Sequence, residues 1–139
     1  MVVIRSSRDG TLMELSRFVG QCNSADADSF AVLVQRGDLK AEARVSAYMA
    51  PHLGEYFESM ATEWTGWQGT KGWSSLEGEF TLSARSDSTG HVTLGYFLRP
   101  PYTGFHWEVK GALELEAGQL SAIAQEVGAA WRGMLRSAA

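Results

Sequence analysis

The sequence predicts an α+β protein in which a bent antiparallel sheet of six or seven strands carries two helices packed on one face. Two observations predict this class. Apolar and polar residues alternate with a period of two through residues 76–116, which is typical of strands with one buried face. The spacing becomes helical in residues 51–64 and again in residues 119–135. The expected order is therefore strands, helix, strands, helix, with the apolar faces sharing one core.

The first fifty residues are expected to form strands joined by short turns. The expected elements are strands over 2–7 and 11–19, a tight turn at 8–10, a polar surface loop over 20–28, and a hairpin from 30 to 49. Gly37 and Asp38 form the turn of that hairpin, because a two-residue turn of this type requires glycine first.

The stretch from Trp64 to Glu77 is interpreted as the joint that fixes the first helix to the following strands. Pro51 suits the first position of that helix, and Gly66 suits the left-handed residue that ends it. Indole rings are costly to leave in water, so this joint predicts tryptophan burial. Trp67 is expected to be partly exposed, whereas four tryptophans are expected in the core: Trp64, Trp73, Trp107 and Trp131.

The second half predicts a three-stranded antiparallel meander followed by a helix. The meander strands cover residues 76–85, 91–99 and 105–116. The buried face of the last helix is expected to comprise Leu120, Ile123, Ala124, Val127, Trp131, Met134 and Leu135. Gly128 costs such a helix about 1 kcal/mol relative to alanine, which suggests a close approach to the other helix or to the sheet.

Length and composition narrow the possible functions. A chain of 139 residues is expected to form a single domain over residues 1–139. The net charge of −4 argues against a nucleic-acid partner, which requires clustered basic residues. Cys22 is the only cysteine, so an internal disulfide and a cysteine-based zinc site are excluded. No signal peptide and no apolar run approaching ~18 residues is present, so no membrane partner and a cytoplasmic location are expected.

Candidate functional residues lie on the polar face of the meander. Pairing the strands by their loops places Glu79 beside Phe97 and His106, with Glu108 in the next row. A histidine flanked by two carboxylates is suited to general acid–base catalysis, but a solvated sheet face with cross-strand charge pairs explains the same pattern more simply. The histidines lack the spacing of metal ligands, and no phosphate loop or nucleophile turn is present. The sequence therefore predicts no catalytic residue, no metal site, no cofactor and no enzymatic activity.

Four short segments resemble a family of small bacterial proteins known only as a domain of unknown function. The matching segments are Trp64-x-Gly66-Trp67-x-Gly69, Trp73-x-Ser75-Leu76-Glu77, Asp87-x-x-Gly90-His91-Val92 and Leu113-x-Leu115-Glu116-x-Gly118-Gln119-Leu120. The resemblance covers residues 53–128 and implies a stand-alone cytoplasmic protein, with no established activity, cofactor or active site. Small acidic α+β proteins of this kind also resemble bacterial immunity proteins, which neutralise a toxin by binding it.

Two functional hypotheses of different classes follow. The leading one is a non-enzymatic protein-binding module, and more narrowly an immunity-type inhibitor, that binds a basic protein through the polar face of the meander. Its expected contact residues are Glu79, Phe97, His106, Glu108 and Trp67. The alternative is a small-ligand-binding protein with a cavity between sheet and helices, lined by Tyr56, Trp73, Tyr96 and Trp107. Either hypothesis is compatible with a homodimer.

Overall fold

A computed structural model describes residues 1–20, 27–87, 89–101 and 107–133. Cys22, His106, Met134 and Leu135 lie outside these residues. The elements follow the expected order of strands, helix, strands, helix. They are β1 (Val2–Arg5), β2 (Leu12–Val19), β3 (Ser29–Arg36), β4 (Leu39–Ser46), α1 (Leu53–Thr62), β5 (Thr70–Ser74), β6 (Phe80–Ser86), β7 (His91–Leu98), β8 (Val109–Glu116), the 3₁₀ turn η1 (Ala117–Gln119) and α2 (Leu120–Trp131).

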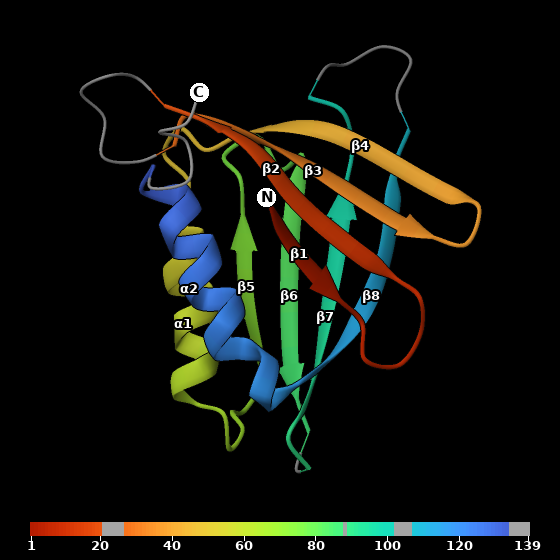
Figure 1. Cartoon of the computed structure of the whole chain (residues 1–139), viewed down its shortest axis with the longest axis vertical. Helices are drawn as coiled ribbons and strands as arrows, with labels where there is room; N and C mark the ends of the chain where they lie inside the picture. The colour runs from red at the N-terminus through yellow and green to blue at the C-terminus, as the bar shows by residue number, and fades with distance from the viewer. Residues whose placement is uncertain (21–26, 88, 102–106, 134–139) are drawn as a thin grey trace.

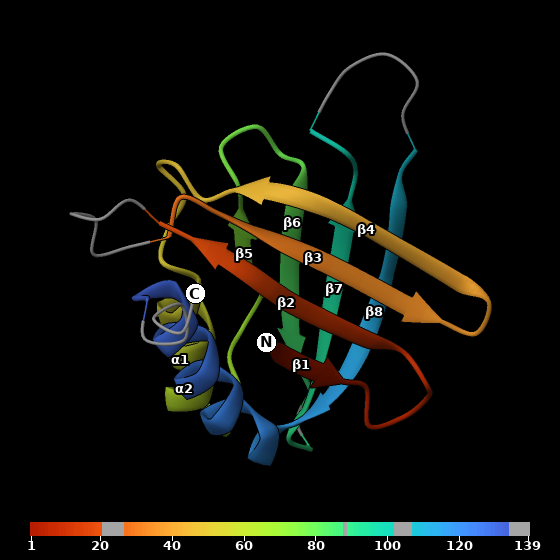
Figure 2. The ribbon, with the colours of Figure 1, turned by 45° about the horizontal axis from the view of Figure 1, so that its top comes forward.

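The strands form two four-stranded antiparallel sheets, so the prediction of one sheet with six or seven strands is wrong. The first sheet has the order β1-β2-β3-β4 and the second has the order β5-β6-β7-β8. The sheets pack one over the other with crossing strands, and the two helices lie together beside β5 (Figures 1 and 2). Alternation shows which face of each strand is buried, but it does not show whether β4 pairs with β5. In the chain α1 lies between β4 and β5, and these two strands belong to different sheets.

One hydrophobic core is shared by both sheets and both helices. Its centre is a set of aromatic rings. Phe30 of β3 lies 5.9 Å from Trp131 of α2 and 6.2 Å from Phe80 of β6, measured between ring centroids. Trp73 of β5 lies 5.7 Å from Phe80 and 6.5 Å from Trp131. The cluster therefore joins the two sheets to α2. Among the described residues, no helix is long and apolar enough to cross a membrane.

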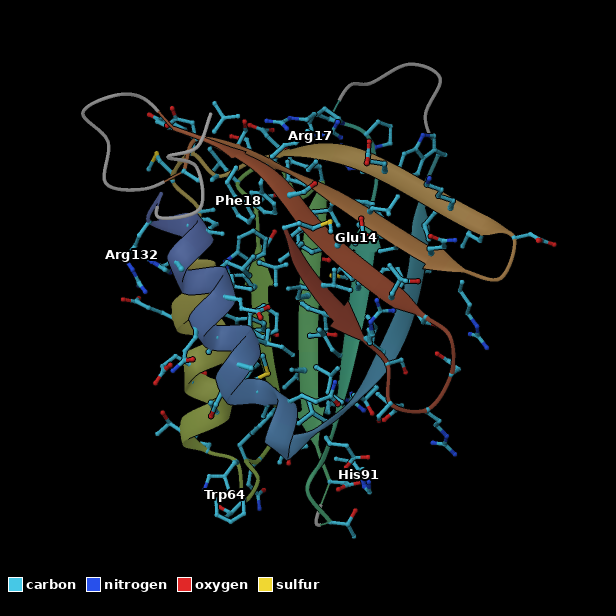
Figure 3. All side chains as sticks on the ribbon, viewed as in Figure 1. Glu14, Arg17, Phe18, Trp64, His91 and Arg132 are labelled. Atoms are coloured by element: carbon cyan, nitrogen blue, oxygen red, sulfur yellow. The ribbon has the colours of Figure 1, made fainter. Side chains whose placement is uncertain are left out.

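The tryptophan predictions are partly confirmed. Trp73 and Trp131 are buried, and Trp67 is partly buried against the core. Trp64 and Trp107 were expected in the core, but they are 62% and 38% exposed. Helix α1 ends at Thr62, so Trp64 lies beyond the last turn and leaves the apolar stripe (Figure 3). Trp107 precedes β8, which begins at Val109, so the strand alternation does not extend to it.

The two helices cross at a pair of glycines, which confirms the close approach expected at Gly128. A β-carbon added at Gly54 of α1 would lie 2.6 Å from the Gly128 Cα and 2.9 Å from the Gly128 N of α2. Both positions are buried. The absence of a side chain at Gly54 therefore sets the distance between the helices and, through them, the position of Trp131.

Candidate functional site

The face of the second sheet that points away from the core, called here the outer face, carries a row of small residues across all four strands. In the strand register Gly72 pairs with Ser83, Ser83 with Gly95, and Gly95 with Ala112. The next row pairs Ser74 with Thr81, Thr81 with Phe97, and Phe97 with Lys110. Residues directly opposite each other in neighbouring strands lie side by side on one face. The row of small side chains therefore lies beside a row that contains the aromatic ring of Phe97 and the ammonium group of Lys110.

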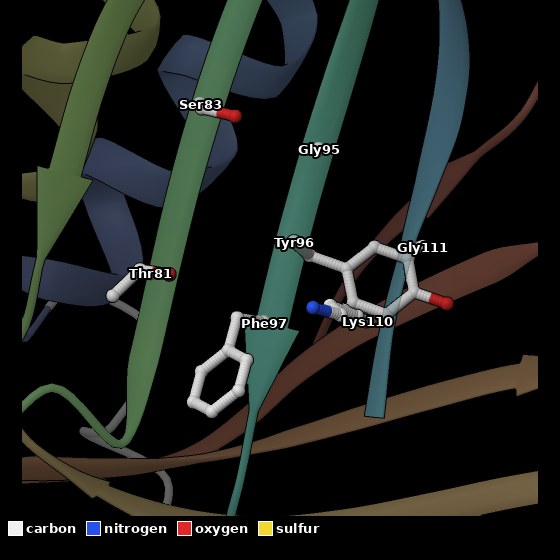
Figure 4. A pocket seen from close by; sticks show the side chains of 7 residues that line it. All are labelled: Thr81, Ser83, Gly95, Tyr96, Phe97, Lys110 and Gly111. Carbon is white, nitrogen blue, oxygen red and sulfur yellow. The ribbon is translucent and has the colours of Figure 1, made fainter. Parts of the chain in front are cut away.

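A hollow of about 380 Å³ lies where these two rows meet. It is lined by Thr81, Ser83, Gly95, Tyr96, Phe97, Lys110 and Gly111. Figure 4 shows Thr81, Phe97 and Lys110 on three neighbouring strands, with Ser83 and Gly95 in the adjoining row. Phe97 is partly buried and Lys110 is exposed. Tyr96 is buried, so the exposed part of the lining offers the hydroxyl groups of Thr81 and Ser83, the Lys110 ammonium and the Phe97 ring. This set suits contact with a side chain of a partner more than covalent chemistry.

The predicted site residues do not come together as expected. Phe97 does lie on the outer face, and it lines the hollow. Its cross-strand neighbours are Thr81 and Lys110, so the predicted pairing with Glu79 and His106 is wrong. The described strands β6 and β8 begin at Phe80 and Val109, later than the alternating pattern indicated.

The other predicted site residues are not neighbours of Phe97 in the strand register, or they lie outside the residues that the structure describes. Glu108 is exposed and precedes β8. Trp67 donates a hydrogen bond from Nε1 to the Ala84 carbonyl oxygen at 3.3 Å, and the Lys71 ammonium lies 5.3 Å from its ring centroid. Trp67 belongs to the loop after α1, and its ring packs this loop against the core. His106 lies outside the described residues.

Glu79 was expected on the polar face, but its residue is only 1% exposed. The Ser75 hydroxyl donates a hydrogen bond to its carboxylate, and the Ser46 backbone N–H donates a second at 3.4 Å. The Ser75 hydroxyl oxygen also accepts from the Phe80 backbone N–H at 3.2 Å. Because Ser46 ends β4 and Ser75 follows β5, the carboxylate links one sheet to the other. Glu79 therefore has a structural role. The alternation of polar and apolar residues placed its side chain on the polar face, which is wrong.

We expect Glu79→Ala to lower the free energy of unfolding by roughly 1–2 kcal/mol, because it leaves the buried Ser75 hydroxyl without its carboxylate acceptor. Glu77→Ala is the matched control, since Glu77 is exposed in the same turn and its loss should change stability by less than ~0.5 kcal/mol. Urea unfolding followed by circular dichroism measures both. Equal stabilities of the two variants would contradict the linking role of Glu79.

A second polar cluster surrounds His91 at the β6–β7 turn. The strand register pairs His91 with Glu116. The His91 Nε2 lies 3.2 Å from the Glu116 carboxylate, and Nδ1 lies 3.4 Å from the Asp87 carboxylate and 2.8 Å from the Thr89 hydroxyl. The three ionisable side chains are about half exposed. Counting the pairs from the end of β8 would have predicted this arrangement.

Asp87 closes this turn as a hydrogen-bond acceptor. Backbone N–H groups of His91 and Thr89 donate to its Oδ1 at 3.0 Å and 2.8 Å, and the Thr89 hydroxyl donates at 2.8 Å. These bonds, with that from His91 contributing most, lower the pKa of Asp87 from 3.8 to about 2. The arrangement matches a side chain that holds a hairpin turn, and we assign it that role.

The Asp87 pKa is directly measurable. A pH titration of its carboxyl carbon by NMR should give a midpoint near 2. A depressed pKa contributes stability that is present above the ordinary pKa of 3.8 and is lost as the pH falls through about 2. Thr89→Ala removes one donor and should raise the midpoint toward 3.8. A wild-type midpoint at the ordinary value would show that the turn does not hold the carboxylate.

Comparison with known proteins places the chain in a family. The sequence matches the family described as "Family of unknown function (DUF6228)" over residues 5–133. The chain belongs to DUF6228. The match extends upstream of residues 53–128, where the resemblance was seen, and includes β2, β3 and β4 of the first sheet. No curated protein and no solved structure gives a significant match to this DUF6228 chain.

Membership in DUF6228 assigns no chemistry to any residue. In the described part of the chain, no group of three or more His, Cys, Asp or Glu side chains is arranged to hold a metal ion. The hollow on the outer face is therefore the candidate site that best combines a predicted residue, Phe97, with a concave surface.

Proposed function

We propose that this DUF6228 protein is a non-enzymatic protein-binding module that contacts its partner through the outer face of the second sheet. The observation that supports this proposal is the hollow beside Phe97, because a concave spot next to an aromatic ring is the type of surface that receives an anchor side chain. The row of small residues at Gly72, Ser83, Gly95 and Ala112 lets a partner approach the sheet closely.

The charge around the hollow changes the expected mode of recognition. Sequence reasoning surrounded Phe97 with carboxylates, whereas its strand neighbour is Lys110 and Glu79 is buried elsewhere. Lys110 suits a carboxylate or a carbonyl oxygen on the partner at this spot. The narrower hypothesis of an immunity-type inhibitor of a basic toxin is supported by the net charge of −4 and the small α+β architecture.

The residues suggested for an internal ligand cavity are used in other ways. Trp73 donates from Nε1 to the Pro51 carbonyl oxygen at 2.8 Å and packs against Phe80 and Trp131. Tyr56 donates from its hydroxyl to the Lys71 carbonyl oxygen at 2.9 Å, and burial raises its pKa. Trp107 is on the surface. These contacts argue against a ligand cavity between the sheet and the helices.

The test is a pull-down from the native cell lysate with four proteins: wild type, Phe97→Ala, Lys110→Glu and Trp64→Ala. Trp64→Ala is the matched control, because it removes a more exposed aromatic ring that does not line the hollow. We expect one stoichiometric protein to be retained by wild type and control and lost by the other two variants. Retention by all four would overturn the assignment of the outer face. Absence of any protein, together with a small molecule in the native mass spectrum, would favour the ligand-binding alternative.

A further inference from the structure

β4 is an edge strand of the first sheet, and no strand among the described residues pairs with its outer side. The two-residue turn Gly37–Asp38 makes Arg36 and Leu39 the closing hydrogen-bonded pair, so alternate pairs along the hairpin are hydrogen-bonded. The N–H and C=O groups of Lys40, Glu42 and Arg44 therefore point away from β3. Ser46 belongs to the same set, and its N–H indeed donates outward to Glu79.

A cleft of about 320 Å³ runs beside this edge. It is lined by Leu39, Lys40, Ala41, Glu42, Trp107 and Val109. Leu39 is 47% exposed and Trp107 is 38% exposed, which is unusual for large apolar side chains beside a strand edge. Main-chain donors and acceptors on one side and apolar side chains on the other are the features that an added β-strand uses.

The side chains of β4 indicate which strand fits. Those on its solvent side alternate in sign from Lys40 to Glu42 to Arg44, and Asp38 in the turn extends the series. Proteins protect free edges with charges that repel a second edge. Alternating charges have the opposite effect when a second copy is antiparallel with Ala41 opposite Ala41, because Lys40 then faces Glu42 of the other copy.

Hydrogen bonding agrees with the same register. Lys40 and Glu42 both direct their N–H and C=O groups outward, so they form a hydrogen-bonded pair across the two-fold axis. Leu39 then faces Ala43 at each end. A register centred on Glu42 would oppose two identical carboxylates. A register centred on Ala43 would pair Glu42 with Arg44, whose guanidinium already donates to the Ser29 Oγ at 2.5 Å and to the Arg17 carbonyl oxygen at 3.3 Å within its own chain. The edge is therefore most complementary to itself when Ala41 lies on the axis.

We propose that two copies of this chain associate through their β4 edges, antiparallel and with Ala41 on the two-fold axis, which joins the first sheets of both copies. The Oε1 of Glu42 accepts from the Arg17 guanidinium of its own chain at 2.7 Å, and its Oε2 would accept from Lys40 of the other copy. The paired segment, residues 39–43, is short, so we expect a dimer that dissociates in the micromolar range. This surface is separate from the outer face, and either proposal can fail alone.

Charge exchange tests the pairing by sedimentation equilibrium of the whole chain. The two-fold axis places each substitution at two Lys40–Glu42 pairs, where it brings like charges together. Lys40→Glu and Glu42→Lys should therefore each raise the dissociation constant of the dimer by about tenfold or more. The double variant Lys40→Glu/Glu42→Lys restores opposite charges across the axis and should associate more tightly than either single variant, although it does not restore the pair between Glu42 and Arg17. Circular dichroism checks that each variant is folded. A wild-type protein that stays monomeric at all concentrations would overturn the proposal, and so would a double variant no better than the singles.

Cysteine cross-linking tests the register. In a Cys22→Ser background, Ala41→Cys places two thiols at a non-hydrogen-bonded pair, where the Cα atoms lie about 4.5 Å apart and a disulfide can form. Ala43→Cys is the matched control, because Ala43 would face Leu39 of the other copy. We expect a covalent dimer from Ala41→Cys under mild oxidation and little from Ala43→Cys. A stronger cross-link at position 43 would reject the proposed register.

Discussion

Replacing Trp131 by alanine is expected to lower the free energy of unfolding by about 3–5 kcal/mol, the largest loss we foresee for a single side chain. Trp131 is 1% exposed, and its ring contacts elements from both halves of the chain. Its ring centroid lies 5.9 Å from that of Phe30 in the first sheet and 6.5 Å from that of Trp73 in the second. Removing the indole leaves a cavity at the point where the two sheets and α2 meet.

Trp64→Ala is the control for this loss. Trp64 is 62% exposed, so its removal should change the free energy of unfolding by no more than ~0.5 kcal/mol. Urea unfolding followed by far-ultraviolet circular dichroism avoids the loss of a fluorophore in either variant. Similar losses for the two variants would mean that the aromatic cluster is not the centre of the core. The sequence alone pointed to Trp64 instead, because it lies at the change from helical to strand spacing.

The faces of the strands were predictable from the sequence, whereas the number of sheets was not. Val92, Leu94, Tyr96 and Leu98 are all buried and alternate with the less buried His91, Thr93, Gly95 and Phe97, as a two-residue period requires. The alternation indicates the buried face of each strand separately. It does not indicate which strands of different hairpins pair with each other. The order strand, helix, strand around α1 is the same whether β4 and β5 share one sheet or belong to two, so the element order did not decide between these topologies.

The candidate site shows the same limit on a smaller scale. The outward direction of Phe97 follows from its parity in β7, and the structure confirms it. Its neighbours depend on where β6 and β8 begin. A shift of two residues in β6 replaces Glu79 by Thr81 beside Phe97, and a shift of four residues in β8 replaces His106 by Lys110. The buried carboxylate of Glu79 contacts the Ser75 hydroxyl, four residues away, and the backbone of Ser46 at the end of β4, 33 residues away. The second contact joins segments distant in the sequence, which the alternation does not show.

Gly54→Ala should be the most damaging change that adds a single methyl group, with an expected loss of roughly 2–3 kcal/mol in the free energy of unfolding. The new β-carbon would lie 2.6 Å from the Gly128 Cα and 2.9 Å from the Gly128 N, and backbone atoms cannot move aside by rotating a side chain. The helices must separate, and the packing of Trp131 on α2 is then disturbed as well.

Gly128→Ala at the same crossing is the matched control, and its effect should be opposite in sign or close to zero. A β-carbon there would lie 2.9 Å from an Arg132 guanidinium nitrogen, at the end of a flexible, exposed side chain that can move (Figure 3). Alanine also favours the helix by about 1 kcal/mol relative to glycine, which offsets that adjustment. Urea unfolding of the two variants separates the effects. Equal losses at both glycines would show that the helices touch through both positions, and an unchanged Gly54→Ala would show that the helices can separate at no cost in stability.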